Sequence, residues 1–308
     1  MKKGRYLITG CAGFIGSNLV NKIYKKYDLV LVDDLSEGSL FNLPKELRKK
    51  LIKKKIQDIK KLKTKKLNGI FHLAAQSSVP ISLKNFYKSS TNNIESSLKV
   101  FEFSKQFKAP IVYASSSAVY GNLSLGNDHK EKFSIKSPYA QDKLTLEHYA
   151  KIAFEIFNVS SVGLRLFNVY GPGQKYNSPY SAVIPIFINR MLKKLPVIIN
   201  GGFQTRDFIY VEDVSDVILM SMKKIQKQKN FKILNLGTGR SIKIDFLFKL
   251  IKKNIGVDPK IIRRKLDKFD PRKSSGTYKK IFKYLNLKKV NFTKLENGLV
   301  KTIDSMKM

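Results

Sequence analysis

The sequence predicts an α/β protein: a doubly wound parallel sheet with a smaller C-terminal domain. Short apolar runs of strand length recur through the first half of the chain, at residues 29–34, 69–75, 110–116 and 159–167. Segments with helical periodicity separate these runs. The runs are apolar on both faces, which is typical of parallel strands that helices cover on both sides.

The first element, RYLITG at residues 5–10, is a short apolar strand. The glycine-rich turn TGCAGFIG follows it and leads into a helix. The apolar side chains of that helix fall on one stripe, formed by Ile15, Leu19, Val20 and Ile23. The sequence therefore begins with a strand–turn–helix unit.

The glycines of this turn, Gly10, Gly13 and Gly16, stand where a dinucleotide-binding site requires them, between a strand and a helix. Glycine lets the backbone turn tightly and approach a pyrophosphate, whose charge is met by the amides and dipole of the helix N-terminus. The alternative is a loop used only for helix–sheet packing, which this context disfavours. We expect a Rossmann-type cofactor site that includes Phe14 and Ile15.

The second strand ends in Asp33 and Asp34, the first of them 23 residues after Gly10. A carboxylate here accepts hydrogen bonds from the adenosine ribose and repels a 2′-phosphate, so the sequence predicts NAD rather than NADP. Asp58 and Ile59, ahead of the next strand, are expected around the adenine.

The regular alternation stops near residue 170, where four prolines between residues 172 and 196 interrupt it. Residues 1–170 are expected to form the cofactor-binding domain. The range 171–308 is expected to form the smaller domain, with 205–230 returning to the first. A strand and a helix at 209–225 make up the predicted return.

The composition, 308 residues with 43% hydrophobic content, is that of a globular protein with a sizeable core. Cys11 is the only cysteine, and the sequence shows neither an apolar run of about 18 residues nor a signal-type leader. We therefore expect a cytoplasmic protein without disulfides or membrane spans. The three His residues are scattered, so no metal site is expected.

The formal net charge of +36 supports a second hypothesis, a noncatalytic nucleic-acid-binding protein on the same fold. Only nine of the 59 basic residues are Arg, although bidentate phosphate recognition favours Arg. The lysines are spread along the chain, with one dense block at residues 45–66. A solvated lysine-rich surface is the preferred interpretation, without a specific nucleic acid. Attraction of anionic substrates follows under either hypothesis.

The stretch SPYAQDK, residues 137–143, places Tyr139 and Lys143 four positions apart on a predicted helix. Such neighbours share one face, which brings a phenol and an ammonium together, but the spacing alone also fits an ordinary solvated face. The glycine turn and the serine-rich strand end VYASSS favour chemistry instead. A Tyr acts as a base near neutral pH only if its phenolate is stabilised, and an adjacent ammonium or a positive nicotinamide ring does so.

Seven motifs occur in a fixed order: TGCAGFIG, LVDD, HLAAQSSV, VYASSSAVYG, SPYAQDK, RLFNVYGPGQ and TRDFIYVEDV. From about residue 5 to 240 the chain resembles the extended short-chain dehydrogenase/reductase family, and within it the 4-epimerases of UDP-glucose and UDP-N-acetylglucosamine. The resemblance implies that Tyr139 is the catalytic base, Lys143 its activator and Ser116 the hydroxyl partner. Ser116 is preferred to Ser117 because it stands four residues before Tyr120.

The resemblance also implies the remaining contacts. Contacts to NAD, beyond the glycine turn and the aspartates, are implied for Leu73, Ala74, Ala75, Gln76, Asn93, Tyr139 and Lys143, with His72 at the edge. Contacts to the nucleotide sugar are implied for Ser116, Ser117, Asn168, Tyr180, Ser181, Val183, Arg206, Asp270 and Ser274.

The sequence departs from the family's pattern near the C-terminus. Thr277 stands where an aspartate is expected. The basic residue that contacts phosphate stays open between Arg263, Arg264 and Lys268.

The activity that the resemblance implies is NAD-dependent 4-epimerisation of a UDP-hexose or UDP-N-acetylhexosamine through a transient 4-keto intermediate. A 4-keto-sugar reductase would use the same three catalytic residues, whereas a dehydratase carries acids where this chain has Ser117 and Ala118. The small Ser274, at a position that gates the space beside carbon 2, favours an N-acetylated sugar. A homodimer is also implied, through the helices expected at 93–107 and 139–157.

Overall fold

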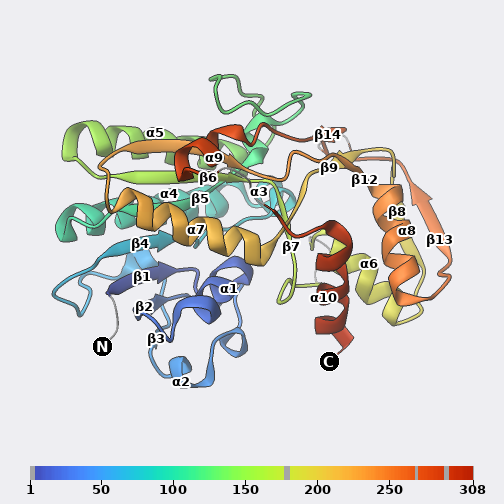
Figure 1. Cartoon of the computed structure of the whole chain (residues 1–308), viewed down its shortest axis with the longest axis horizontal. Coiled ribbons are helices and arrows are strands. Elements are labelled where there is room, and N and C mark those ends of the chain that lie inside the picture. Colours follow the sequence, from blue (N-terminus) through green and yellow to red (C-terminus); the bar gives the residue numbers. More distant parts are fainter. Residues whose placement is uncertain (1–3, 177–180, 268–269, 288–290, 308) are drawn as a thin grey trace.

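The computed structural model describes residues 4–176, 181–267, 270–287 and 291–307. Its main lobe is a parallel sheet in the order β11-β6-β5-β4-β1-β2-β3, with helices on both faces (Figure 1). The strands are β1 (Arg5–Thr9), β2 (Asp28–Val32), β3 (Leu51–Ile52), β4 (Gly69–His72), β5 (Ile111–Ser116), β6 (Ser161–Leu166) and β11 (Phe231–Leu236). The strand order reverses between β1 and β4, as in Rossmann folds, so the predicted doubly wound sheet is confirmed.

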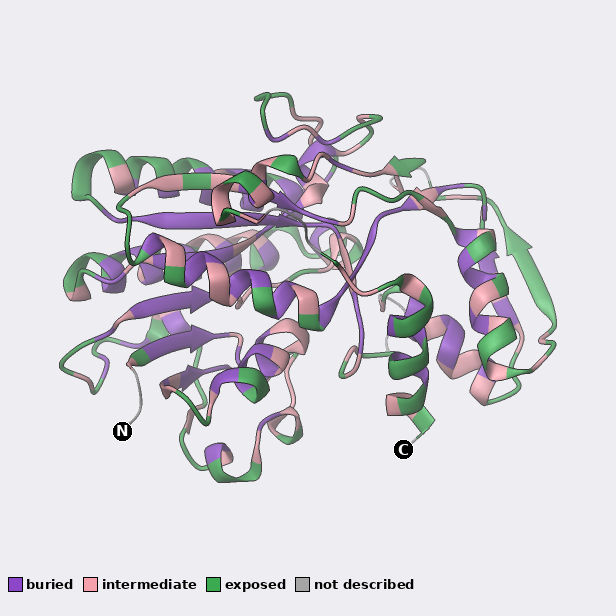
Figure 2. Ribbon diagram, in the orientation of Figure 1, coloured by how far each residue is buried: buried purple, intermediate pink, exposed green. Residues whose placement is uncertain are grey.

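Successive residues of each strand face opposite helical layers, as Leu7 and Ile8 of β1 illustrate. Ile8 packs in the core beneath α1 (Phe14–Ile23), α7 (Val211–Ile225) and α9 (Lys279–Leu285). Leu7 packs in the core beneath α4 (Phe86–Phe107) and α5 (Pro138–Phe157), and the short α3 (Val79–Lys84) contacts these two helices. Burial on both faces, visible as purple strands in Figure 2, explains the continuous apolar runs.

The lysine-rich block does not form the expected helical connection. Between β2 and β4 the chain forms η1 (Leu40–Asn42), α2 (Lys45–Arg48), the short β3 and η2 (Ile56–Asp58). Isolated apolar residues of the block, such as Leu47 and Ile56, are buried. Without a continuous apolar stripe, and with clustered ammonium groups repelling one another, a longer helix has little to hold it against the sheet.

A smaller lobe has an apolar core of its own. Its helices are α6 (Val183–Leu192), α8 (Ile244–Ile255) and α10 (Leu295–Lys307). Its strands form two small sheets, β8 (Val197–Asn200) with β13 (Ile261–Arg264), and β9 (Thr205–Arg206) with β12 (Ile242–Lys243) and β14 (Lys273–Ser274). Figure 1 shows this lobe beside the main sheet.

The chain passes between the two lobes several times. β7 (Asn168–Tyr170) and β10 (Phe208–Tyr210) form a parallel pair of their own, so β10 does not join the main sheet as a returning strand. Helix α7 does return to the main lobe, where it packs against α1. β11 and α9 also belong there, so the returning part of the chain is longer than residues 205–230.

In the described part of the chain, every helix is too short or too polar to cross a membrane.

Candidate active site

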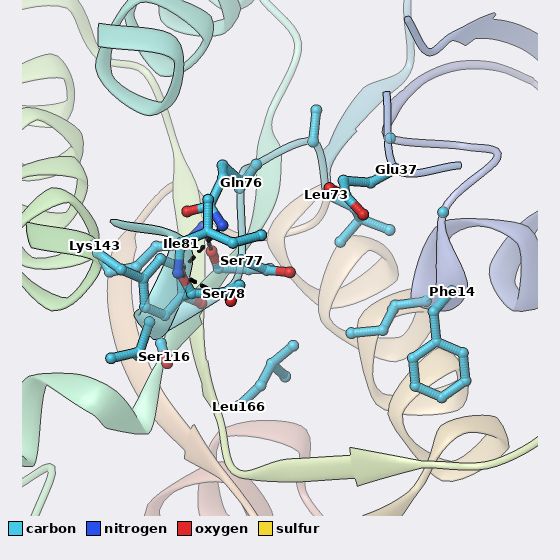
Figure 3. Close-up of a pocket in the computed structure, with 18 of the residues that line it drawn as sticks. Phe14, Glu37, Leu73, Gln76, Ser77, Ser78, Ile81, Ser116, Lys143 and Leu166 are labelled. Carbon is cyan, nitrogen blue, oxygen red and sulfur yellow. Dashed lines mark hydrogen bonds between the residues drawn. The ribbon is translucent and has the colours of Figure 1, made fainter. Parts of the chain in front are cut away.

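A cleft of about 970 Å³ follows the carboxyl ends of β1, β4 and β5. The main lobe forms most of its wall, and residues such as Ser181, Arg206 and Ser274 close it from the smaller lobe. Figure 3 shows Ser116 and Lys143 toward one end, and Phe14 and Glu37 toward the other. Ligands of doubly wound sheets bind at this edge, where the strand order reverses.

The predicted glycine turn forms one end of the cleft, which is lined there by Gly10, Gly13, Phe14, Ile15 and Gly16. Gly10 has a φ of +69°, and a Cβ at this position would lie 2.6 Å from the Ala74 nitrogen. A Cβ at Gly16 would lie 2.0 Å from the Gly10 carbonyl oxygen. Only glycine fits at Gly10 and Gly16, and the turn brings the N-terminus of α1 to the cleft.

The two predicted aspartates both line the cleft beside this turn. The carboxylate of Asp33 accepts hydrogen bonds from the backbone amides of Ala12 and Leu35, each at 2.9 Å. Burial raises the pKa of Asp33, and these two hydrogen bonds oppose the change. Asp34 accepts hydrogen bonds from the amide and hydroxyl of Ser36 at 3.0 and 2.6 Å. Each oxygen has a second lone pair, so both carboxylates can still accept from a ribose.

The expected adenine contacts Asp58 and Ile59 do not line the cleft. Asp58 is exposed and lies in a separate shallow depression, beside Glu95 and Glu102 of α4. Ile59 is buried in the core beneath α4 and α5. The neighbouring Ile56 and Gln57, with Lys54 and Lys55, line the cleft in their place.

The segment after β4 contributes Leu73, Ala74, Ala75 and Gln76 to the cleft, as expected. Asn93, also predicted as a contact, lies behind this segment. Its side-chain oxygen accepts from the Gln76 amide at 2.8 Å, and its nitrogen donates to the Gln76 carbonyl at 3.1 Å. Asn93 therefore holds the main chain of Gln76 in position.

His72 is buried between Thr9 and Ser97, with ring nitrogens 2.8 and 3.2 Å from their hydroxyls. Burial lowers the pKa of His72 to about 3, and the charge of Lys143 acts in the same direction. A neutral His72 below the floor of the cleft supports the strand end rather than contacting a ligand.

Ser116, Tyr139 and Lys143 line the same part of the cleft. Ser116 ends β5, and its hydroxyl accepts from the Ala118 amide at 3.1 Å. Ser137 caps α5 by accepting from the Ala140 amide at 3.2 Å, so Tyr139 falls in the first turn of the helix and Lys143 one turn later. The Lys143 ammonium donates to the Ala114 carbonyl at 2.8 Å and lies 5.8 Å from the centre of the Tyr139 ring.

Burial is the largest influence on the pKa values of Tyr139 and Lys143. It raises the pKa of Tyr139, and the nearby Ser116 hydroxyl opposes the change. It lowers the pKa of Lys143 to about 8, against the charges of Asp142 and Glu147. Lys143 thus keeps its proton at neutral pH, yet the Tyr139 pKa stays raised. Further positive charge in the cleft would favour ionisation of Tyr139.

The expected sugar-nucleotide contacts that line the cleft are Ser116, Ser117, Asn168, Ser181, Arg206, Asp270 and Ser274. Arg206 is buried, forms an ion pair with Asp270 and donates to the carbonyl of Pro271 at 2.8 Å. Val183 begins α6 and does not line the cleft, although Ala182 before it does. Tyr180 lies outside the described residues.

Two of the three candidates for the phosphate-binding residue lie away from the cleft. Arg263 and Arg264 are exposed on β13 and do not line the cleft, and Arg263 pairs with Asp245 at 3.1 Å. Lys268 lies outside the described residues. Of the predicted basic contacts, Arg206 lines the cleft.

The departure at Thr277 has a structural explanation. The Thr277 hydroxyl donates to the carboxylate of Asp128 at 2.7 Å. Asp128 belongs to the segment between β5 and α5. The carboxylate that the family pattern places at position 277 is therefore supplied here by the hydrogen-bond partner of Thr277. This contact anchors the chain three residues beyond Ser274.

Several residues that line the cleft were not predicted from the sequence. Ser77 and Ser78 follow the expected segment and line the cleft, where Figure 3 labels both. Both belong to the HLAAQSSV motif, and this position could have indicated that they line the cleft. Glu37 and Lys175 line the cleft and form an ion pair at 3.6 Å. No local pattern connects positions so far apart in the chain.

No group of three or more His, Cys, Asp or Glu side chains in the described ranges could hold a metal ion.

Residues 6–237 match the model of the NAD dependent epimerase/dehydratase family, so the chain belongs to this family and is an enzyme of it. A relative from Methanocaldococcus jannaschii, provisionally named a UDP-glucose 4-epimerase, is 37% identical over 81% of this chain and 82% of its own. The glycine turn, with the N-terminus of α1 behind it, fits a dinucleotide. The predicted cofactor, NAD, is confirmed.

Solved structures show the same architecture. A UDP-N-acetylglucosamine 4-epimerase from Methanobrevibacter ruminantium, in complex with UDP-N-acetylmuramic acid, superposes with a TM-score of 0.92. It is 33% identical, covering 100% of this chain and 99% of its own. A UDP-glucose 4-epimerase from Thermus thermophilus, in complex with NAD, has a TM-score of 0.85 at 27% identity, covering 98% and 99%.

Replacing Tyr139 with Phe should separate binding from turnover. Tyr139→Phe removes one hydroxyl from a cleft whose other contacts remain, so turnover should fall by about 100-fold or more while NAD affinity and melting temperature stay close to wild type. Steady-state kinetics, calorimetry and thermal unfolding measure the three quantities. The matched control is Tyr149→Phe, an exposed position on the same helix. Substantial turnover in Tyr139→Phe would refute the role of Tyr139.

Proposed function

We propose that the protein is a NAD-dependent nucleotide-sugar 4-epimerase acting on a UDP-hexose or UDP-N-acetylhexosamine. The observation that carries the proposal is that Ser116, Tyr139 and Lys143 meet in one cleft, between the glycine turn and the smaller lobe. Relatives named as UDP-sugar 4-epimerases align over most or all of this chain, which supports the same substrate class.

In the proposed reaction Tyr139 takes the proton of the sugar 4-hydroxyl and later returns it. When bound, NAD supplies a hydride acceptor and donor together with the positive charge of its oxidised ring. That charge and the Lys143 ammonium together offset the burial that raises the Tyr139 pKa. The Ser116 hydroxyl donates a hydrogen bond to the reacting oxygen, which fixes its orientation as charge develops.

Inversion at carbon 4 requires the nucleotide to stay fixed while the sugar turns over. Arg206 suits the diphosphate end, because its guanidinium is buried and oriented by Asp270 and two backbone carbonyls. Asn168 also lines the cleft, at the start of β7, where its side chain donates to the Asp207 carbonyl at 3.3 Å. These side chains would anchor the diphosphate.

The segment after Ser116 disfavours a dehydratase. Such an enzyme needs a general acid to expel water from the sugar. Ser117 and Ala118 line the cleft here, and neither is acidic. A 4-keto-sugar reductase would use the same Ser116, Tyr139 and Lys143, and differs by consuming a reduced cofactor.

Product stereochemistry is the direct test. The protein is incubated with NAD and each of UDP-glucose, UDP-galactose and their N-acetylated counterparts, and the sugars are identified by NMR. We expect interconversion of gluco and galacto forms without net change in the cofactor. Loss of water or consumption of reduced cofactor would indicate a dehydratase or reductase, and no conversion of any sugar would refute the proposal.

Ser274 is proposed to leave room for an acetamido group on carbon 2. Its small side chain lines the cleft from β14, four residues after Asp270. Ser274→Tyr should therefore lower kcat/KM for UDP-N-acetylglucosamine by about tenfold or more relative to UDP-glucose, because the ring fills space that the acetamido group needs. Ser274→Ala, which keeps the space, is the control. Equal losses on both sugars would show that Ser274 does not gate carbon 2.

A homodimer formed through α4 and α5 is proposed from their exposed apolar side chains. Phe86 and Tyr87 begin α4, and Ile152 and Ile156 lie on α5; each is at least 45% exposed. The two helices pack side by side in the same direction, with Asn93 bonded to Asp142 and Lys105 over the ring of Phe157, so these residues expose apolar surface near the two ends of the helix pair. Light scattering should give a dimer, and Ile156→Asp should shift it toward monomer. A monomeric wild type would contradict the proposed interface.

A further inference from the structure

A buried ion pair lies directly behind the catalytic residues. Glu147 on α5 and Arg165 on β6 are 3% and 5% exposed. Two hydrogen bonds join them, from Arg165 Nε to Glu147 Oε1 at 2.8 Å and from Nη2 to Oε2 at 2.6 Å. Ser115 on β5 donates to the same Oε1 at 2.5 Å. Glu147 thereby connects one helix to two neighbouring strands.

Further hydrogen bonds extend from Arg165 to Tyr120, Asn235 and Asp128. Arg165 Nη1 donates to the Tyr120 hydroxyl at 2.8 Å, which donates to the Asn235 side chain at 2.7 Å. The backbone N–H of Asn235 donates to the Asp128 carboxylate at 2.9 Å. Three of the five N–H donors of the guanidinium thus have a partner, on Glu147 and Tyr120, and the buried positive charge faces a buried negative one.

Stability alone gives little reason for such a pair. Removing two charges from water costs about as much as their attraction returns, and well-packed apolar residues often serve equally well. Tyr120, Glu147 and Arg165 are buried and do not line the cleft. Their effect on chemistry must pass through the residues they hold.

The positions of the partners point to one such effect. Ser115 immediately precedes Ser116, so fixing it fixes the end of β5. Glu147 lies four residues after Lys143 on the same face of α5. Resting on the proposed function, we propose that Glu147 is a positioning residue that fixes α5 to the end of β5 and so sets Tyr139 and Lys143 against Ser116.

The charge of Glu147 also acts on Lys143. Around that ammonium, Asp142 and Glu147 on α5 are acidic, His72 on β4 is neutral, and Arg165 lies beyond Glu147. Burial lowers the pKa of Lys143 to about 8, and the two acids oppose it. Loss of the Glu147 charge would remove one opposing contribution and leave Arg165 unpaired, so the pKa of Lys143 should fall further. Lys143 would then lose its proton at lower pH.

The test is Glu147→Gln, which keeps the shape of the side chain and removes its charge. We expect kcat to fall by about 10- to 100-fold with KM within about twofold, because the substrate contacts remain while the reacting groups are displaced. The alkaline limb of the kcat profile should move to lower pH by about half a unit or more. Glu155→Gln, an exposed position on the same helix, is the control and should match wild type. Wild-type kcat and an unmoved limb in Glu147→Gln would overturn the proposal.

A binding measurement separates this proposal from the proposed function. Lys143 lines the cofactor cleft, so NAD affinity measured by calorimetry from pH 6.5 to 10 should show an inflection that Lys143→Met removes. In Glu147→Gln that inflection should lie at lower pH, whether or not any sugar is turned over. An inflection unmoved in this variant, or absent from wild type, would overturn the role of Glu147. Failure of sugar turnover alone would overturn only the epimerase assignment.

A second variant covers the case in which Glu147→Gln does not fold. Ser115→Ala removes only the hydrogen bond between the strand and Glu147 and leaves the charge pair intact. It should lower kcat by about fivefold or more at unchanged KM, with the inflection in NAD affinity unmoved. Wild-type kcat in Ser115→Ala would show that the contact with β5 does not position Ser116.

Discussion

Close contact between main-chain segments at the glycine turn is the constraint on which the cofactor half of the site depends. Gly10 meets the chain after β4, and Gly16 at the start of α1 meets the carbonyl of Gly10. No side chain fits between them. Asp33 then ties the end of β2 to the same turn through the Ala12 amide. Three strand ends and one helix N-terminus are thereby held together by close backbone contacts and one side-chain hydrogen bond.

The half of the cleft proposed to carry the reaction depends on side chains instead. Ser116 stands on a strand and Tyr139 and Lys143 on a helix, so their mutual geometry requires β5 and α5 to keep one relative position. The hydrogen bonds from Lys143 to the Ala114 carbonyl and from Ser115 to Glu147 are polar links between these elements, and Glu147 also pairs with Arg165 of β6. Packing in the layer beneath α4 and α5 supplies the rest.

The parts of this structure that the sequence predicted are those that local pattern specifies. Continuous apolar runs indicated a sheet buried on both faces, and the strand–turn–helix unit indicated the position of the cofactor. The i, i+4 spacing put Tyr139 and Lys143 on one face. The adenine contacts of Asp58 and Ile59 stay a prediction, since Ile56 and Gln57 of the same short 3₁₀ turn line the cleft and these two residues do not.

Other features depend on tertiary neighbours that no local pattern encodes. The role of Asn93 follows from a main-chain segment 17 positions away, and Thr277 is matched by an acid 149 positions away. The lysine block lacks the apolar stripe that would hold a helix, although its sequence separates two strands as helices elsewhere do. Glu147 gave no signal as an isolated acid in a helix that contains several charged residues.

The repeated crossings between the lobes affect how the molecule is made. One edge strand of the main sheet, β11, and the helix α9 that packs on it come from residues 231–236 and 279–285. On a ribosome, the first six strands would emerge long before these segments. During that interval β6 would present an unpaired edge and an uncovered apolar face. The cofactor lobe is thus built from segments that are not continuous in the chain. Its sheet and helical layer are complete only after most of the smaller lobe has also been synthesised.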